Sequence, residues 1–186
     1  MNIIGGDKRG AKLATCNSTA VRPTGQRTRE ALFNILQGGR FSVSVAGAVV
    51  IDLFAGTGAI GLEALSRGAD QALFVEQDRS ALKTLQANIT KLGMQSRSVI
   101  LAQDALTIAR WPHPAADLIF ADPPYDSGLA GQALDRLFDV GAISQKTVIV
   151  VETRKTDPCL LSPHFDLIDS RSYGIAKLNF FALASD

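Results

Sequence analysis

Short apolar runs rich in β-branched residues alternate with amphipathic stretches through the middle of the chain. Within those stretches, apolar residues recur at helical spacing, as in the segment that ends at Gly93. The alternation predicts right-handed βαβ units and a mostly parallel sheet with helices on both faces. The expected strands cover residues 49–53, 72–75, 98–101, 117–121 and 147–151, and the expected helices cover 59–66, about 82–92 and 129–138.

The two ends of the chain break this rhythm. Residues 165–173 and 177–183 resemble two strands joined at Gly174 with no helix between them, which predicts an antiparallel hairpin. Residues 2–5 and 11–14 flank a turn-like segment and predict a second hairpin, and a helix is expected to run from Thr24 as its N-cap through Leu36. We therefore expect a Rossmann-like α/β fold with a small N-terminal hairpin and helix extension at 1–40 and the main domain at 41–186.

Charge is distributed unevenly along the chain, although the formal net charge is only +1. Residues 1–40 hold seven basic and two acidic side chains, a balance of +5, while the rest of the chain carries −4. A basic extension on an acidic body predicts a polyanionic partner contacted mainly through the N-terminal part. The candidate contacts are Lys8, Arg9, Lys12, Arg22, Arg27 and Arg29.

The composition argues against a membrane protein, a secreted protein and a disulfide-rich protein. Hydrophobic residues make up 46% of the chain, enough for a globular core, and no apolar run reaches the length of a membrane helix. The first residues lack the basic and apolar regions of a secretory signal. Cys16 and Cys159 form neither a metal-binding nor a disulfide pattern, which fits a reducing compartment. We expect a cytoplasmic protein that binds no metal and no membrane.

A glycine-rich segment, Asp52–Gly61, follows the first expected strand and leads into a helix. Its glycines allow the backbone to approach a ligand closely. Glu76 ends the second strand, where a carboxylate can accept both ribose hydroxyls of a nucleoside. Gly56, Gly58 and Gly61 also match the dinucleotide fingerprint, so NAD is a competing ligand. The carboxylate of Asp52 favours instead a ligand that carries an ammonium and a sulfonium.

A second motif, Asp122-Pro123-Pro124-Tyr125, directly follows the fourth expected strand. An exocyclic base amine is a poor nucleophile because its lone pair is delocalised into the ring. A carboxylate and a backbone carbonyl can each accept one N–H and so direct that lone pair towards a methyl donor, and the prolines fix the carbonyl. Tyr125 offers a flat face on which a flipped-out base can stack. The motif indicates methyl transfer to such an amine.

These motifs resemble those of class I S-adenosylmethionine-dependent methyltransferases that act on amino groups. The segments 3–13, 22–34 and 61–69 are similar, more narrowly, to the bacterial small-subunit (16S) ribosomal RNA guanine-N2 methyltransferase family. The resemblance covers nearly the whole chain and is most specific in residues 1–80 and 117–126. It implies a seven-stranded sheet, S-adenosylmethionine as cofactor, and methylation of one guanine of 16S rRNA in an assembling small subunit.

The resemblance also implies roles for single residues. Asp52 and the turn Gly56-Thr57-Gly58 would hold the methionine part of the cofactor, Glu76 its ribose and Asp104 its adenine amine. Asp122, with Pro123, Pro124 and Tyr125, would bind the target amine and base. The arginines at 22, 27 and 29 would meet either RNA phosphate or the cofactor carboxylate.

Three alternatives remain. A DNA adenine-N6 methyltransferase can share the Asp-Pro-Pro-Tyr motif, but such enzymes usually need extra chain to read DNA, and only 61 residues follow Tyr125. An NAD-dependent dehydrogenase would need a proton-relay histidine or a Tyr-Lys pair, and neither stands at a plausible spacing. A nucleic-acid-binding protein on a decayed methyltransferase fold would have a broken glycine turn or no Asp122, whereas both are intact.

Overall fold

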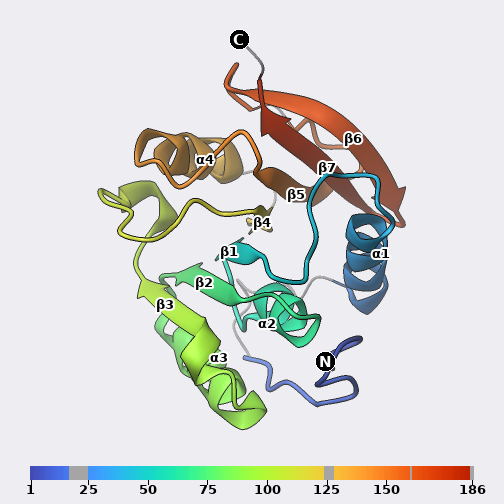
Figure 1. Ribbon diagram of the computed structural model, residues 1–186, viewed down its shortest axis with the longest axis vertical. Helices are drawn as coiled ribbons and strands as arrows, with labels where there is room; N and C mark the ends of the chain where they lie inside the picture. The colour runs from blue at the N-terminus through green and yellow to red at the C-terminus, as the bar shows by residue number, and fades with distance from the viewer. Residues whose placement is uncertain (17–24, 124–127, 160, 185–186) are drawn as a thin grey trace.

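A seven-stranded sheet forms the centre of the protein, as the computed structural model shows for residues 1–16, 25–123, 128–159 and 161–184 (Figure 1). Its strand order is β3-β2-β1-β4-β5-β7-β6. The strands are β1 (Val49–Leu53), β2 (Gln71–Glu76), β3 (Ser98–Ala102), β4 (Leu118–Ala121), β5 (Val148–Arg154), β6 (Phe165–Tyr173) and β7 (Ala176–Leu183).

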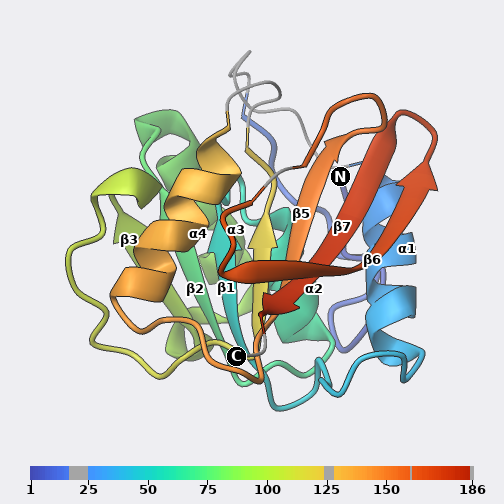
Figure 2. The same cartoon turned by 90° about the horizontal axis from the view of Figure 1, so that it is seen from above.

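Strands β1 to β5 pair in parallel, whereas β7 is antiparallel to both β5 and β6. The predicted α/β class, the mostly parallel sheet and the C-terminal antiparallel hairpin are therefore confirmed. Because all five parallel strands run the same way, their carboxyl ends meet at one edge of the sheet, and the β6–β7 turn returns to that edge. Figure 2 shows this edge at the top, where the arrow of β4 points.

In the described residues, four α-helices connect and cover the strands: α1 (Gln26–Gln37), α2 (Ala59–Ser66), α3 (Arg79–Leu92) and α4 (Leu129–Asp139). Two short 3-10 helices, η1 (Gln95–Arg97) and η2 (Ala105–Thr107), flank β3. Local signals set the ends of α3: the Asp78 side chain accepts a hydrogen bond from Ala81 N at 2.8 Å, and Gly93 ends the helix with φ 67°. No helix in the described part of the chain is long and apolar enough to cross a membrane.

The two faces of the sheet bury separate cores. On one face, alternate strand residues such as Val50, Phe74 and Phe120 pack against apolar residues of α1, α2 and α3. On the other face, the intervening strand residues, such as Ile119, pack against α4 and η2. In Figure 2, α4 lies in front of the sheet and α2 behind it. Burial on both faces explains why the strands are continuous apolar runs rather than alternating ones.

The N-terminal segment belongs to the first of these cores. Ile3 and Leu13 are only 1% and 5% exposed and pack with residues of α1 and α2. The expected hairpin forms over a short length: Ile3 N donates to the carbonyl oxygen of Ala11 and Leu13 N to that of Met1, both at 2.9 Å, around a β-bridge between Asn2 and Lys12. Gly6 has φ 77°, and a Cβ there would lie 1.7 Å from the carbonyl oxygen of Ser66, the last residue of α2, so both the conformation and the space require glycine. Thr24, the predicted N-cap of α1, lies outside the described residues.

Candidate active site

The chain turns sharply where β1 ends, at the carboxyl edge of the sheet. Phe54 has φ 59°, and among the described residues it is the one non-glycine position with a positive φ. Gly56 and Gly58 follow with φ 55° and 80°. A non-glycine residue in this region costs about 1–3 kcal/mol and commonly marks a functional site. The turn delivers the chain to the N-terminus of α2, whose first amides face the carboxyl edge.

Two glycines of this segment are required by packing inside the protein. A Cβ on Gly58 would lie 2.3 Å from Leu85 Cδ1 of α3. A Cβ on Gly61 would lie 2.4 Å from Phe74 Cε1 and 3.2 Å from Asp52 Oδ2. The sequence suggested that these glycines let a ligand approach, but the space beside both is filled by side chains of α3, β1 and β2. They bring α2 close to the sheet, which fixes the turn.

Asp52 lies beneath the turn and is 3% exposed. Its Oδ2 accepts a hydrogen bond from Gly61 N at 2.9 Å, which satisfies an amide in the first turn of α2. The pKa of Asp52 is raised to about 8, chiefly by burial and to a smaller extent by the nearby negative charges of Asp122 and Glu76, against the opposing hydrogen bond from Gly61. Three carboxylates from adjacent strands therefore act on one another at this edge.

Glu76 and Asp104 are both held by backbone amides. Glu76 Oε2 accepts from Gly56 N at 2.8 Å, and its Oε1 accepts from the amides of Gln77 and Asp78 at 2.9 and 2.8 Å. Asp104 Oδ1 accepts from Leu106 N at 3.0 Å and caps η2 beyond the end of β3. A carboxylate oxygen has further acceptor capacity, so both groups can also receive hydrogen bonds from a ligand.

Asp122 and Pro123 follow β4 directly and are both half-buried. The register pairs Leu53 of β1 with Ala121 of β4, so Asp122 comes level with the turn that follows β1. Across the edge the order is then Asp104 after β3, Glu76 on β2, the glycine turn after β1, and Asp122 after β4. Pro124 and Tyr125, the other two predicted catalytic residues, lie outside the described residues.

The family model described as conserved hypothetical protein 95 matches residues 1–182. The chain belongs to this family. It is 33% identical over 184 residues to ribosomal RNA small subunit methyltransferase D of Haemophilus influenzae, and the match covers 97% of this chain and 93% of that protein. It is 37% identical over 153 residues to the protein of the same name from Escherichia coli K12, covering 82% and 74% of the two chains. The solved structure of yhhF from Escherichia coli matches with a TM-score of 0.83 and 29% identity, covering 100% and 99%.

The resemblance to the small-subunit rRNA methyltransferase family is thus confirmed, and so is the class I methyltransferase fold. The chain is a methyltransferase, and class I membership implies S-adenosylmethionine as cofactor. The residues present fit that group. The acidic groups of Asp52, Glu76 and Asp122 lie close enough for the last two to disfavour ionisation of Asp52, so the edge suits a ligand with positive sulfonium and ammonium charges better than one with a pyrophosphate. Nothing in the family supports the NAD-dependent alternative.

Asn88 contacts the glycine turn, although its sequence context did not single it out. It is fully buried, and its Nδ2 donates to the carbonyl oxygens of Thr57 and Ala14 at 3.0 and 3.2 Å. Its Oδ1 accepts from Ala14 N at 2.8 Å. Asn88 thereby ties the glycine turn to the N-terminal segment. The available signal was a polar residue within the apolar stripe of α3, beside Leu85 and Ile89.

The expected RNA contact by Arg29 needs correction, because its side chain is fully buried. Its Nη2 donates to the carbonyl oxygen of Asn2 at 2.6 Å, and its Nε lies 3.8 Å from Glu63 Oε2. Burial lowers the pKa of Arg29, and the Glu63 carboxylate counteracts this. Glu63, on α2, also accepts from Ile4 N and Gly5 N at 2.8 Å each and from Arg67 Nε at 2.7 Å. Arg29 therefore has a structural role that joins α1 to α2.

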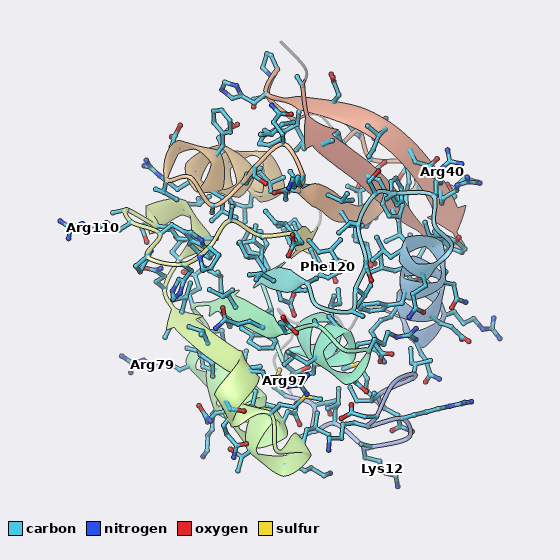
Figure 3. All side chains as sticks on the ribbon, in the orientation of Figure 1. Lys12, Arg40, Arg79, Arg97, Arg110 and Phe120 are labelled. Carbon is cyan, nitrogen blue, oxygen red and sulfur yellow. The ribbon has the colours of Figure 1, made fainter. Side chains whose placement is uncertain are left out.

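The other predicted RNA contacts that the structure describes lie at the surface. Arg9, Lys12 and Arg27 are exposed, and Lys8 has its Nζ 3.9 Å from Asp7 Oδ2. Lys12 points away from the body of the protein, whereas Phe120 of β4 lies near its centre (Figure 3).

Lys8 N donates to Ser66 Oγ, so the tip of the N-terminal segment lies at the C-terminal end of α2. That end is about 12 Å from the glycine turn, the length of an eight-residue helix. Arg22 lies outside the described residues.

Proposed function

We propose that this protein transfers a methyl group from S-adenosylmethionine to the exocyclic N2 amine of a guanine in small-subunit (16S) ribosomal RNA. The observation that carries the proposal is the position of Asp122, an amine acceptor at the carboxyl end of β4 that acts electrostatically on Asp52 beneath the glycine turn. The Asp122 carboxylate, as acceptor for the target amine, thus lies next to the expected position of the cofactor's methyl group. The names of the curated relatives support ribosomal RNA as the substrate.

In this proposal the protein positions and activates the amine. When bound, S-adenosylmethionine supplies an electrophilic methyl group on its sulfonium sulfur. The Asp122 carboxylate and the Pro123 carbonyl each accept one N–H of the amine, which directs the nitrogen lone pair out of the base plane. As nitrogen gains its methyl group it becomes positively charged, and the Asp122 carboxylate is placed to take the surplus proton. Pro124 stiffens the motif and Tyr125 stacks on the base.

The cofactor in this proposal extends across the neighbouring strands. Glu76 receives the ribose hydroxyls, Asp104 accepts the adenine amine, and Asp52 with the turn Gly56-Thr57-Gly58 surrounds the methionine part. Support comes from the strand order, which places these groups in sequence along one edge. Each hydrogen bond to a charged group contributes about 1.5–3 kcal/mol.

The RNA partner is proposed to contact the exposed basic residues of the N-terminal part: Lys8, Arg9, Lys12, Arg22 and Arg27. Lys91 of α3 adds a further cation there, since its Nζ donates to the carbonyl oxygen of Lys12 at 2.8 Å. The described residues form one sheet with its covering helices, and we place the specificity in RNA already shaped by ribosomal proteins. The favoured substrate would then be a partly assembled small subunit in the cytoplasm.

Radiolabelled methyl transfer with nucleoside analysis tests the proposal. We expect label to appear as N2-methylguanine in assembly intermediates of the small subunit, less in free rRNA, and none in duplex DNA. Asp122→Ala should lower the initial rate of labelling by about tenfold to a hundredfold. Asp139→Asn, which removes an exposed carboxylate at the far end of α4, should retain it. Label recovered as N6-methyladenine in DNA would replace the proposal with the DNA-modifying alternative.

A further inference from the structure

A further acidic side chain lies at the carboxyl edge, on β5. Glu152 is only 6% exposed. Alternate residues of a strand face the same side of a sheet, and Val148 and Val150 pack in the core beneath α1, α2 and α3. Glu152 therefore projects to that side of the sheet. By the same reasoning, Val50 places Asp52 on that side as well.

The strand register puts Glu152 beside Asp122. Phe120 pairs with Val150, and Ala121 pairs with Val151. The next residue of each strand is therefore Asp122 and Glu152, level with one another on neighbours about 4.8 Å apart. Since β5 lies beyond β4 from β1 and β2, Glu152 is on the side of Asp122 that faces away from the glycine turn and Glu76.

The space beside Glu152 is where the proposal places the ring of the target base. If the amine is held at Asp122 and the methyl donor lies over β1 and β2, the base extends towards β5. Guanine carries an N1–H donor directly beside its 2-amino group. Adenine has an N1 lone pair beside its 6-amino group instead, and a buried carboxylate repels a lone pair. A carboxylate next to Asp122 thus matches guanine and opposes adenine.

We propose that Glu152 accepts the N1–H of the target guanine and so determines the base that this enzyme methylates. The inference rests on the proposed function, which it deepens by assigning the choice between guanine and adenine to one side chain. Sites that hydrogen-bond a substrate group discriminate strongly against analogues that lack it, because a buried polar group is then left facing the wrong partner.

A base analogue separates this role from a structural one. RNA substrates are made with either guanine or 2,6-diaminopurine at the methylated position, and 2,6-diaminopurine keeps the 2-amino group but has an N1 acceptor. Wild-type enzyme should prefer guanine by about tenfold or more in kcat/KM. Glu152→Gln offers an amide N–H to that acceptor, so its preference should fall or reverse. Glu30→Gln, a matched change on the exposed face of α1, should behave as wild type.

The outcomes distinguish the two proposals. If wild-type enzyme methylates guanine N2 but Glu152→Gln slows both substrates by the same factor, Glu152 is structural and the inference is overturned. If wild-type enzyme methylates no guanine in any RNA, the proposed function itself fails. Should Glu152→Gln not fold, Glu152→Asp serves instead. That variant keeps the charge but withdraws it by one methylene, so guanine activity should fall about tenfold or more with no gain on 2,6-diaminopurine.

Discussion

The buried charges at the two ends of helix α2 differ in their surroundings: opposite charges meet at one end and acidic groups gather at the other. At its C-terminal half, Glu63 lies among Arg29, Arg67 and the amides of Ile4 and Gly5, so that opposite charges meet. At its N-terminal end, the carboxylate of Asp52 lies near two further carboxylates, and its pKa is raised to about 8. One group of charges is matched within the protein, and in the other the charges repel.

The arrangement of buried charges separates a structural cluster from a binding site. The matched cluster holds the N-terminal segment, α1 and α2 together, and any ligand there would have to displace an existing partner. At the other end, burial and two neighbouring acidic groups disfavour ionisation of Asp52, and a cationic ligand would offset that cost. A structural role is therefore expected for the first cluster and a binding role for the second.

The largest expected effect is on the matched cluster. Glu63→Gln removes the negative charge and leaves the Arg29 guanidinium buried without its counter-charge, so we expect a loss of about 3–5 kcal/mol in the free energy of unfolding. Urea denaturation followed by circular dichroism measures this. Glu30→Gln is the control and should change stability by less than about 0.5 kcal/mol. Equal stability of the two variants would show that the cluster does not hold these segments together.

The reverse pattern is expected at the carboxyl edge. Asp122→Ala should slow methyl transfer by about tenfold to a hundredfold, because the charge-assisted hydrogen bond to the amine is removed. Its stability should equal or exceed that of the wild type, since one charge that repels Asp52 is gone. Single-turnover assays and urea denaturation on the same variant give both values. A strongly destabilised Asp122→Ala protein would remove the contrast between the two ends of α2.

The sequence predicted the elements whose signals are local. The strands are apolar runs, and α3 begins after its N-cap Asp78 and ends before its C-cap Gly93. Carboxylates at strand ends could likewise be assigned to one edge once the strands were taken as parallel. The role of Arg29 could not be predicted, because Glu63 reaches it only through tertiary packing.

The same limit applies to the N-terminal segment and to Glu152. The two arms of the segment pair with one another as expected, but the segment is docked on α2 and α3 by tertiary hydrogen bonds that no local pattern reports. Glu152 ends an apolar run just as Glu76 does. Its place beside Asp122 depends on the strand order, which the sequence alone does not specify.

A smaller effect concerns the pH dependence of Asp52. Its pKa is raised from 3.8 to about 8, so the folded protein holds a proton that the unfolded chain releases, and stability should fall as pH rises between those values. A cationic cofactor favours the ionised form, so its affinity should rise towards pH 8 by up to about tenfold per unit. Calorimetry in two buffers of different ionisation enthalpy should detect proton release on binding. Asp52→Asn should release none; equal release by both proteins would contradict the assignment.

The smallest effect is expected at the exposed basic residues. Arg9→Glu and Lys12→Glu should leave folding intact and lower the salt dependence of RNA binding by a slope of about 0.7–0.9 for each phosphate that the protein no longer neutralises. Binding titrations across salt concentrations measure the slope, with Arg110→Glu on the opposite side of the molecule as control (Figure 3). These point changes are sharper than removal of residues 1–20, which would also withdraw Ile3 and Leu13 from the core. An unchanged slope would mean that these side chains are only a solvated surface.

Asn88 gives the two ends of α2 a thermodynamic connection. One side-chain amide binds the carbonyl oxygen of Thr57 in the glycine turn and both backbone groups of Ala14 in the N-terminal segment. A ligand that displaces the Thr57 carbonyl would disturb the amide that also holds Ala14, and we expect binding at the turn and at the segment to be coupled through Asn88. Any such coupling would be equal in both directions.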